Sequence, residues 1–336
     1  MRLFAARFAA LALLLVPLAA PAGASGVSAL YVFGDSLSDQ GNLRAITGGA
    51  APVAPTYPVG TFSNGPTWAD GLSRTLGLGP SLPSLLGGTN FAFGLARTDS
   101  ADPGLGIPAS INLPGQVQAY VAGPNAPSGA LFAVWAGANN LLQALAAASG
   151  QPDPTAFLTM EAAGAVGGVL AALETLRLDG ARDFLVLNMP DLGRVPRFTV
   201  SPQVSAIATG VSQGFNQGLA QGLAAFDAIP GVNLRTVDVF ALFQEVFANP
   251  GGSGLTNLAT PCITGPVPDI YLNPLAATNG CTPAQAATTL FWDPIHPTAA
   301  GHAQVAAAAI AVVPAPAAAG LLAFALLGLV ALRRRG

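Results

Sequence analysis

The chain has 336 residues, of which 51% are hydrophobic and 9% are charged, so it can bury a full hydrophobic core and is not a disordered protein. All 13 basic residues are arginines, and five of them lie in residues 1–24 and 314–336, which leaves eight against 16 acidic residues. The sequence therefore has no basic stripe that could neutralise a phosphate backbone, which excludes a nucleic-acid partner.

Residues 1–24 have the order of a secretory signal peptide. Arg2 and Arg7 precede an apolar run from Phe8 to Ala20, and the small residues Ala22, Gly23 and Ala24 follow. A charged segment, an apolar segment and a small-residue cleavage site in this order are removed on export. We therefore expect an exported protein that is cleaved after Ala24.

Strand-like and helix-like segments alternate along residues 25–313. Short apolar runs closed by Gly, Asn or Pro, typical of buried parallel strands, occur at 28–33, 130–137, 183–190 and 231–239. Helical stretches separate or follow them at 66–77, 154–178, 202–226 and 297–313. The alternation predicts one doubly wound α/β sandwich with a single parallel sheet, and no repeat or linker indicates a second domain.

Ser36 follows the first of these strands, in the sequence Gly34-Asp35-Ser36. In an open α/β sheet, ligands gather beyond the carboxyl ends of the strands, so the position suits a nucleophile. A Ser or Asp just before a helix can equally serve as its N-cap. These residues alone leave both interpretations open.

A second serine, Ser212, lies in the sequence Gly-Val-Ser-Gln-Gly at 210–214, which fits the G-x-S-x-G nucleophile elbow of α/β-hydrolases. However, glycines recur at 210, 214, 218 and 222, and an apolar row at 211, 215 and 219 has the same spacing. Spacing by four is that of a helix face, and no strand precedes the serine. We interpret Ser212 as part of a helix.

The two cysteines, Cys262 and Cys281, lie in a loop-like region rich in Pro, Gly, Asn and Thr. In an exported chain, a pair with no leftover is most simply one disulfide, and no Cys or His cluster has the spacing of a zinc site. We predict a disulfide between them and no metal site.

The chain also has two histidines. His296 lies three residues after Asp293, and Pro294 and Pro297 stiffen the turn, so carboxylate and imidazole can share one loop. A serine nucleophile needs such a base, held by a carboxylate. We therefore favour His296 as the base, whereas His302 falls within the following Ala-rich helix and is expected to be structural.

Four short blocks follow one another along the chain: FGDSLSDQGN at 33–42, NFAFGLA at 90–96, AGANN at 136–140 and DPIHPTAAGH at 293–302. In these blocks and in their order, residues 29–313 resemble the GDSL, or SGNH-hydrolase, family of esterases and lipases. The resemblance implies a flavodoxin-like three-layer α/β/α fold. It also implies hydrolysis of carboxylic esters through an acyl-enzyme, without cofactor or metal.

The resemblance assigns roles to residues of these blocks. It implies that Ser36 is the nucleophile, that His296 is its base and that Asp293 orients the imidazole. Asn139 matches the side-chain donor of the oxyanion hole. The alternative for Asn139 is a cap on the following helix, a role that Asn140 could equally take.

The remaining oxyanion donors of the family are backbone N–H groups, one from Ser36 itself and one from the second block. Two glycines are common there, whereas this chain has Gly94 and Leu95. A backbone donor survives a change of side chain, so the oxyanion hole can persist. We expect Gly94 to be the donor, with Leu95 as the alternative.

Residues 314–336 combine a Pro-rich entry, an apolar run from Ala317 to Leu332 and three final arginines. The run is shorter than the roughly 20 residues that a membrane span needs. The order resembles the PEP-CTERM sorting signals, with Ala315 where Glu is usual. The resemblance implies transient membrane attachment, cleavage by an exosortase and delivery to the surface or extracellular matrix of a Gram-negative bacterium; a lasting membrane anchor is the alternative.

Taken together, these features predict an exported serine esterase or lipase whose ester could be a lipid, a small ester or an acylated polysaccharide. An acyltransferase that uses the same site and a non-catalytic surface protein on a hydrolase fold are the alternatives. The nucleophile, base, orienting acid and oxyanion donor are all present. This favours catalysis, because a degenerate binding protein is expected to have lost at least one of them.

Overall fold

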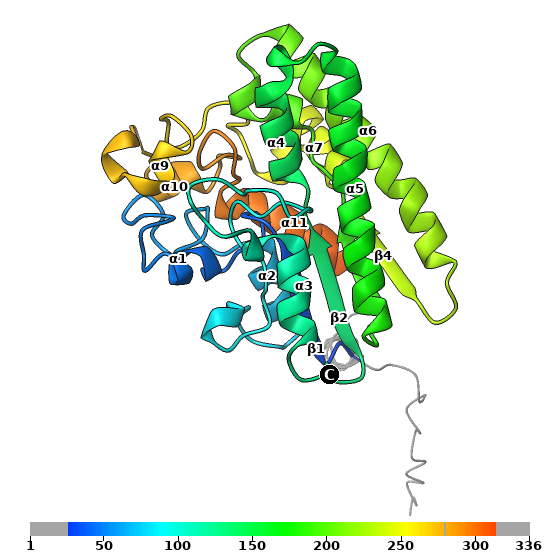
Figure 1. Cartoon of the computed structure of the whole chain (residues 1–336). Coiled ribbons are helices and arrows are strands. Elements are labelled where there is room, and N and C mark those ends of the chain that lie inside the picture. Colours follow the sequence, from blue (N-terminus) through cyan, green and yellow to red (C-terminus); the bar gives the residue numbers. More distant parts are fainter. Residues whose placement is uncertain (1–25, 279, 314–336) are drawn as a thin grey trace, which may run out of the picture.

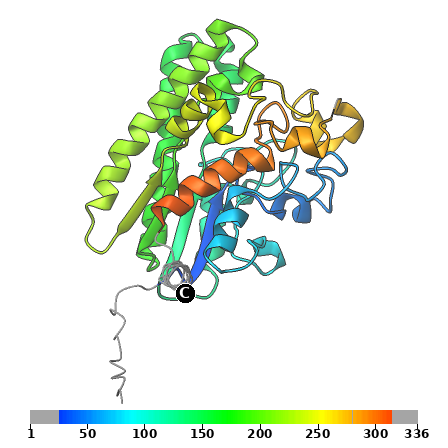
Figure 2. The same cartoon turned by 180° about the vertical axis from the view of Figure 1, so that it is seen from behind.

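The computed structural model describes residues 26–278 and 280–313 (Figures 1 and 2). The predicted signal peptide at 1–24 and the predicted sorting or anchor segment at 314–336 lie outside the described residues.

The centre of the fold is a parallel sheet of four strands in the order β1-β2-β3-β4. The strands are β1 (Ala29–Gly34), β2 (Ala130–Trp135), β3 (Asp183–Leu187) and β4 (Asn233–Val237). Each lies within one of the four apolar runs identified in the sequence, apart from one residue at the end of β1. All six residues of β2 are buried, as a central strand covered on both faces requires.

A fifth segment, residues 89–93, runs parallel to β1 along its free edge. The N–H of Val32 donates to the Thr89 carbonyl at 3.1 Å, and the N–H of Phe91 donates back to the Val32 carbonyl at 2.7 Å. The N–H of Phe93 then donates to the Gly34 carbonyl at 3.2 Å. The segment completes a flavodoxin-like strand order, and it brings the residues after Phe93 to the carboxyl end of β1.

Helices cover both faces of the sheet, so the molecule is the predicted three-layer α/β/α sandwich (Figures 1 and 2). One face carries α3, α5 and α6, and the other carries α2 and α11. The helices are α1 (Asn42–Ile46), α2 (Trp68–Thr75), α3 (Leu113–Val121), α4 (Ala138–Ala147), α5 (Pro154–Leu178), α6 (Pro202–Asp227), α7 (Val239–Ala248), α8 (Pro250–Ser253), α9 (Asp269–Leu272), α10 (Pro283–Ala286) and α11 (Ala299–Val312).

Helix α5 is long and apolar enough to cross a membrane by length and composition alone. In the structure it packs against α3, α4 and α6 within the helical layer. Its buried residues, which include Leu158, Val166, Leu173 and Leu176, belong to the main hydrophobic core. The apolar character of α5 is therefore accounted for by this packing.

A disulfide joins Cys262 to Cys281 and closes the loop 262–281, which contains α9. The backbone N–H groups of Cys262 and Ile263 donate to the carbonyls of Phe291 and Trp292, at 3.0 and 2.8 Å. The loop 262–281 is thereby fixed to the residues that directly precede Asp293.

Candidate active site

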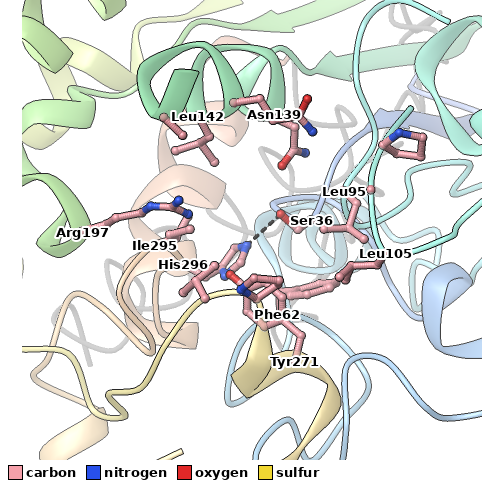
Figure 3. A pocket seen from close by; sticks show the side chains of 16 residues that line it. Ser36, Phe62, Leu95, Leu105, Asn139, Leu142, Arg197, Tyr271, Ile295 and His296 are labelled. Atoms are coloured by element: carbon pink, nitrogen blue, oxygen red, sulfur yellow. Dashed lines mark hydrogen bonds between the residues drawn. The ribbon is translucent and has the colours of Figure 1, made fainter. Parts of the chain in front are cut away.

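Ser36 lies just beyond the carboxyl end of β1, at the sheet edge where ligands gather in open α/β folds. Gly34 makes this exit possible, because its φ is +151° and a Cβ atom there would lie 2.1 Å from the Trp135 carbonyl oxygen of the neighbouring strand. Figure 3 shows the Ser36 hydroxyl directed into a cavity and toward His296.

The loop after Ser36 is held by the buried carboxylate of Asp39. This carboxylate accepts backbone N–H groups from Gly41, Asn42 and Leu43 at 2.7, 2.7 and 3.1 Å. It also accepts the N–H of Gly94 at 2.8 Å, which ties the first sequence block to the second. Asp39 therefore organises the loop that carries the serine and does not face the cavity.

The structure brings Ser36, His296 and Asp293 together. The Nε2 atom of His296 lies 2.8 Å from the Ser36 Oγ (Figure 3). Its Nδ1 atom lies 2.7 Å from the Asp293 Oδ2. The side chains of His296 and Asp293 are almost fully buried, and Ser36 is 8% exposed. This is the geometry of a serine nucleophile, a base and an orienting acid.

The Asp293 carboxylate is fully paired. Its Oδ1 atom accepts the backbone N–H groups of Ile295 and His296 at 2.7 and 2.8 Å. Its Oδ2 atom accepts the hydroxyl of Tyr57 at 2.7 Å in addition to pairing with the imidazole. Burial by itself would raise the pKa of Asp293, but His296 and the backbone donors outweigh it and lower the pKa below its usual range. The carboxylate is therefore ionised at neutral pH.

Tyr57 is the one partner of this group that the sequence did not indicate. It is fully buried in an irregular, Pro-rich loop, and no motif surrounds it. Its ring packs near Phe62 and Tyr271, and the rings of both of these contact His296. These aromatic rings thus pack around the imidazole, and Phe62 and Tyr271 also line the cavity that contains Ser36.

Asn139 lies in the first turn of α4, directly after β2, and its side chain lies near the Ser36 hydroxyl in Figure 3. One Nδ2 hydrogen donates to the Ala96 carbonyl at 2.9 Å, which leaves the second hydrogen of the amide available. Asn140 instead fixes the neighbouring loop by accepting the Thr98 N–H and donating to Asp99. The two asparagines therefore have different tasks, and Asn139 is the one that lines the cavity.

The expectation that Gly94 supplies the backbone donor is wrong, because its N–H already donates to the Asp39 carboxylate. Leu95, the alternative, lines the cavity beside Ser36, its φ is +69°, and its N–H donates to no atom in the described part of the chain, so this N–H is free to act as the donor. Gly94 must be glycine for another reason, since a Cβ atom there would lie 2.2 Å from the Phe62 ring. The N–H of Ser36 is likewise unengaged within the described chain.

The second serine and the second histidine, Ser212 and His302, lie outside this group of catalytic side chains. Ser212 is buried in α6, where its Oγ donates to the Ala208 carbonyl and accepts the Leu192 N–H. His302 is buried in α11, as the sequence indicated. Among residues 26–278 and 280–313, no group of three or more His, Cys, Asp or Glu side chains could hold a metal ion.

Ser36 and His296 lie where two cavities meet. The larger cavity, of about 210 Å³, is lined by Leu95, Leu105, Arg197 and Tyr271, among others. The narrower one, of about 40 Å³, has apolar walls that include Trp135, Phe243, Phe247 and Phe291. An ester bound at Ser36 can therefore place its acyl and alcohol portions in two chemically different spaces.

Comparison with known proteins agrees with this geometry. The GDSL-like Lipase/Acylhydrolase family matches residues 30–309. An uncharacterized protein of the trpE-trpG intergenic region of Pseudomonas putida is 32% identical over 92% of this chain. Esterase EstA of Pseudomonas aeruginosa is 29% identical over 89% of the chain, and the phosphatidylcholine-sterol acyltransferase of Aeromonas hydrophila is 27% identical over 82%.

These relatives differ in length. The chain spans 52% of the Pseudomonas putida protein and 48% of EstA, about half of each, but 87% of the Aeromonas hydrophila acyltransferase.

Proposed function

Because this chain belongs to the GDSL-like lipase/acylhydrolase family, we propose that it is a serine esterase that hydrolyses carboxylic esters through an acyl-enzyme on Ser36. The observation that carries the proposal is the buried series of contacts from Ser36 to His296 at 2.8 Å and from His296 to Asp293 at 2.7 Å. A hydroxyl is a weak nucleophile at neutral pH, and this arrangement supplies the base that activates it.

In the proposed reaction, the Ser36 Oγ attacks the ester carbonyl carbon while His296 Nε2 takes the hydroxyl proton. The carbon–oxygen bond to the alcohol then breaks, and the imidazolium returns the proton to the leaving alkoxide. A water molecule attacks the acyl-enzyme by the same route, releasing the carboxylic acid and restoring Ser36. The ionised Asp293 holds the imidazole in the required tautomer and stabilises the imidazolium.

The negative oxygen of each tetrahedral intermediate would be held by three donors: the N–H groups of Ser36 and Leu95 and the free amide hydrogen of Asn139. Such donors act in the transition state, and each is commonly worth about 10² to 10³ in rate. Ser36, Leu95 and Asn139 line the same cavity, which supports chemistry at this site over a purely structural role.

The narrow apolar cavity beside Ser36 suits the acyl chain, and its small volume favours short chains. Hydrolysis of p-nitrophenyl esters from acetate to palmitate tests both points. We expect turnover of the short esters without added metal and little turnover of palmitate. The absence of hydrolysis for every ester would leave the non-catalytic surface protein as the explanation.

Acyl transfer is the second candidate activity, because the Aeromonas hydrophila relative is named as an acyltransferase. Both activities share the acyl-enzyme and differ only in whether water or an alcohol attacks it. Assays with and without an acceptor alcohol separate them: ester formation at the expense of free acid would identify a transferase.

We further propose that the protein is exported and sorted to the cell surface or extracellular matrix of a Gram-negative bacterium. The signal-like residues 1–24, the PEP-CTERM-like residues 314–336 and the disulfide support this location. Intact-mass analysis of protein from the native host tests it. A chain from near Ser25 to near Pro314 supports sorting by an exosortase, whereas a membrane-bound chain that retains Arg333–Gly336 contradicts it.

A further inference from the structure

The arginines of the described chain fall into groups by what their side chains contact. Those paired with a carboxylate are Arg74, Arg97, Arg177 and Arg235. Arg44 and Arg182 donate to backbone carbonyls. Arg194 and Arg197, both beside the active site, have no carboxylate partner among the described residues. In an acidic protein, this places the unpaired cations at the catalytic cavity.

The two unpaired arginines are not equivalent. Arg194 is exposed, and its guanidinium lies over the Phe247 ring, 5.0 Å from the centroid. Arg197 is half-buried and lines the larger cavity together with Ser36 and His296. Its backbone N–H donates to the Pro294 carbonyl at 2.9 Å, so it is fixed to the loop that carries Asp293 and His296.

A second polar group in the same cavity lacks a partner. The side chain of Tyr271 is 3% exposed, and its hydroxyl makes no hydrogen bond within the described chain. A buried polar group without a partner destabilises a fold, so it is unusual unless a ligand satisfies it. Burial raises the pKa of Tyr271 well above its ordinary value, which keeps the hydroxyl a neutral donor.

The two groups lie on the same side of the catalytic machinery. In Figure 3 the Arg197 and Tyr271 side chains both lie next to His296, whereas Asn139 and Leu95 lie nearer Ser36. His296 Nε2 delivers the proton to the leaving alcohol, so the alcohol portion of an ester must lie next to the imidazole. A donor pair on this side therefore contacts the alcohol portion.

We propose that Arg197 and Tyr271 form a binding site for an anionic group, a phosphate or a carboxylate, on the alcohol portion of the ester. The inference rests on the proposed esterase function and names its substrate class. A guanidinium and a hydroxyl can together donate to two oxygens of one anion. The nearby Asp293 carboxylate is fully buried and already accepts four hydrogen bonds, so it has no free acceptor position directed at the cavity.

The test compares three esters that share one acyl group. They are the butanoyl monoesters of glycerol, of glycerate and of glycerol 3-phosphate, which carry no charge, a carboxylate and a phosphate. For the wild-type enzyme, we expect kcat/KM to be about 10- to 100-fold higher for at least one anionic ester than for the neutral one, the range of a charge-assisted hydrogen bond. The comparison between the two anions decides which of them the site prefers.

Variants assign this preference to the named groups. Arg197→Met should bring the ratio of anionic to neutral kcat/KM close to one, because the ratio compares esters within the same variant and so separates loss of anion binding from any general change in turnover. Tyr271→Phe, which keeps the ring beside His296, should lower the ratio by about 5- to 10-fold, as expected for the loss of one hydrogen bond. Arg182→Met is the control: it removes the same charge before β3, far from the cavity, and should leave the ratio unchanged.

Each outcome bears on one claim. If the wild type hydrolyses the neutral ester without any preference for an anion, the inference is wrong although the esterase function stands. It is equally wrong if Arg197→Met leaves the preference intact or lowers kcat/KM equally for all three esters, since Arg197 would then act only on the loop of His296. If the wild type hydrolyses none of these esters or the p-nitrophenyl esters, the proposed function itself has failed.

Discussion

The hydroxyl of Tyr57 donates a 2.7 Å hydrogen bond to Oδ2 of Asp293, although 236 positions separate the two residues in the sequence. The same oxygen pairs with Nδ1 of His296, so the tyrosine and the imidazole share one acceptor. Tyr57 does not reach the substrate cavity; it is a positioning residue that sets how strongly Asp293 holds the imidazole.

Tyr57→Phe should therefore change the pH dependence of catalysis. With one donor fewer, the carboxylate becomes a stronger acceptor for the imidazolium, so the acidic limb of kcat/KM should move to higher pH by up to about one unit. The measurement is a pH–rate profile on a stable ester, with thermal unfolding as the control for folding. If the acidic limb of kcat/KM does not move while the melting temperature falls, Tyr57 contributes only to packing.

Asn139→Ala should lower kcat by about 10²- to 10³-fold with little change in KM, because the lost donor acts on charge that develops in the transition state. Steady-state kinetics on p-nitrophenyl butyrate measure both constants. Asn140→Ala provides a neighbouring comparison, since its contacts to Thr98 and Asp99 are structural and its effect should appear mainly in stability. Equal losses of kcat in the two variants would argue against the oxyanion role.

His302 should make the protein acid-sensitive. Burial, with a smaller contribution from the charge of His296, lowers the pKa of His302 from 6.5 to about 3. The unfolded chain therefore binds a proton between these pH values that the folded chain does not. Stability from this residue is complete above pH 6.5 and is lost toward pH 3, by about 1.4 kcal/mol per pH unit.

His302→Leu replaces the titrating imidazole with an apolar side chain of similar size in α11. The free energy of unfolding of the variant, measured by urea denaturation between pH 7 and pH 4, should fall less steeply than that of the wild type. Other groups titrate equally in both proteins, so the difference between the two curves isolates His302. Parallel curves would contradict the assignment.

Removal of the disulfide by Cys262→Ser together with Cys281→Ser should cost roughly 3 kcal/mol of stability for a loop of this sequence separation. The loop 262–281 closed by the disulfide carries Tyr271, whereas Ser36 and Asn139 are held by other contacts. We therefore expect a lower melting temperature and a changed substrate preference before any large loss of turnover on p-nitrophenyl butyrate. Urea denaturation and the ester comparison provide the two readouts.

Much of the fold could be predicted because buried parallel strands leave uninterrupted apolar runs, and α5 and α6 follow long helical patterns between them. The positions of Ser36, Asp293 and His296 could be predicted because a strand exit and a three-residue spacing are local features. The segment at 89–93 was not recognised as a strand, since only a few hydrogen bonds to β1 define it.

The parts of the site that escaped prediction depend on contacts between distant segments. The choice between Gly94 and Leu95 depends on a hydrogen bond from Gly94 to Asp39, which no local pattern records. Tyr57 bonds Asp293 from an irregular loop, and Tyr271 packs against His296 from the short helix α9; neither tyrosine lies in a sequence motif. That Arg197 lines the cavity without a carboxylate partner is visible only in the folded chain, where most of the other arginines are paired.

The central claim, that Ser36 is the nucleophile, is tested most directly by covalent labelling. The purified protein is treated with a serine-directed organophosphate and analysed by intact mass and peptide mapping, beside the Ser36→Ala variant. We predict one label per chain, located on Ser36, together with complete loss of esterase activity, and neither labelling nor activity in a folded Ser36→Ala protein. A label on Ser212, or full activity in Ser36→Ala, would contradict the account.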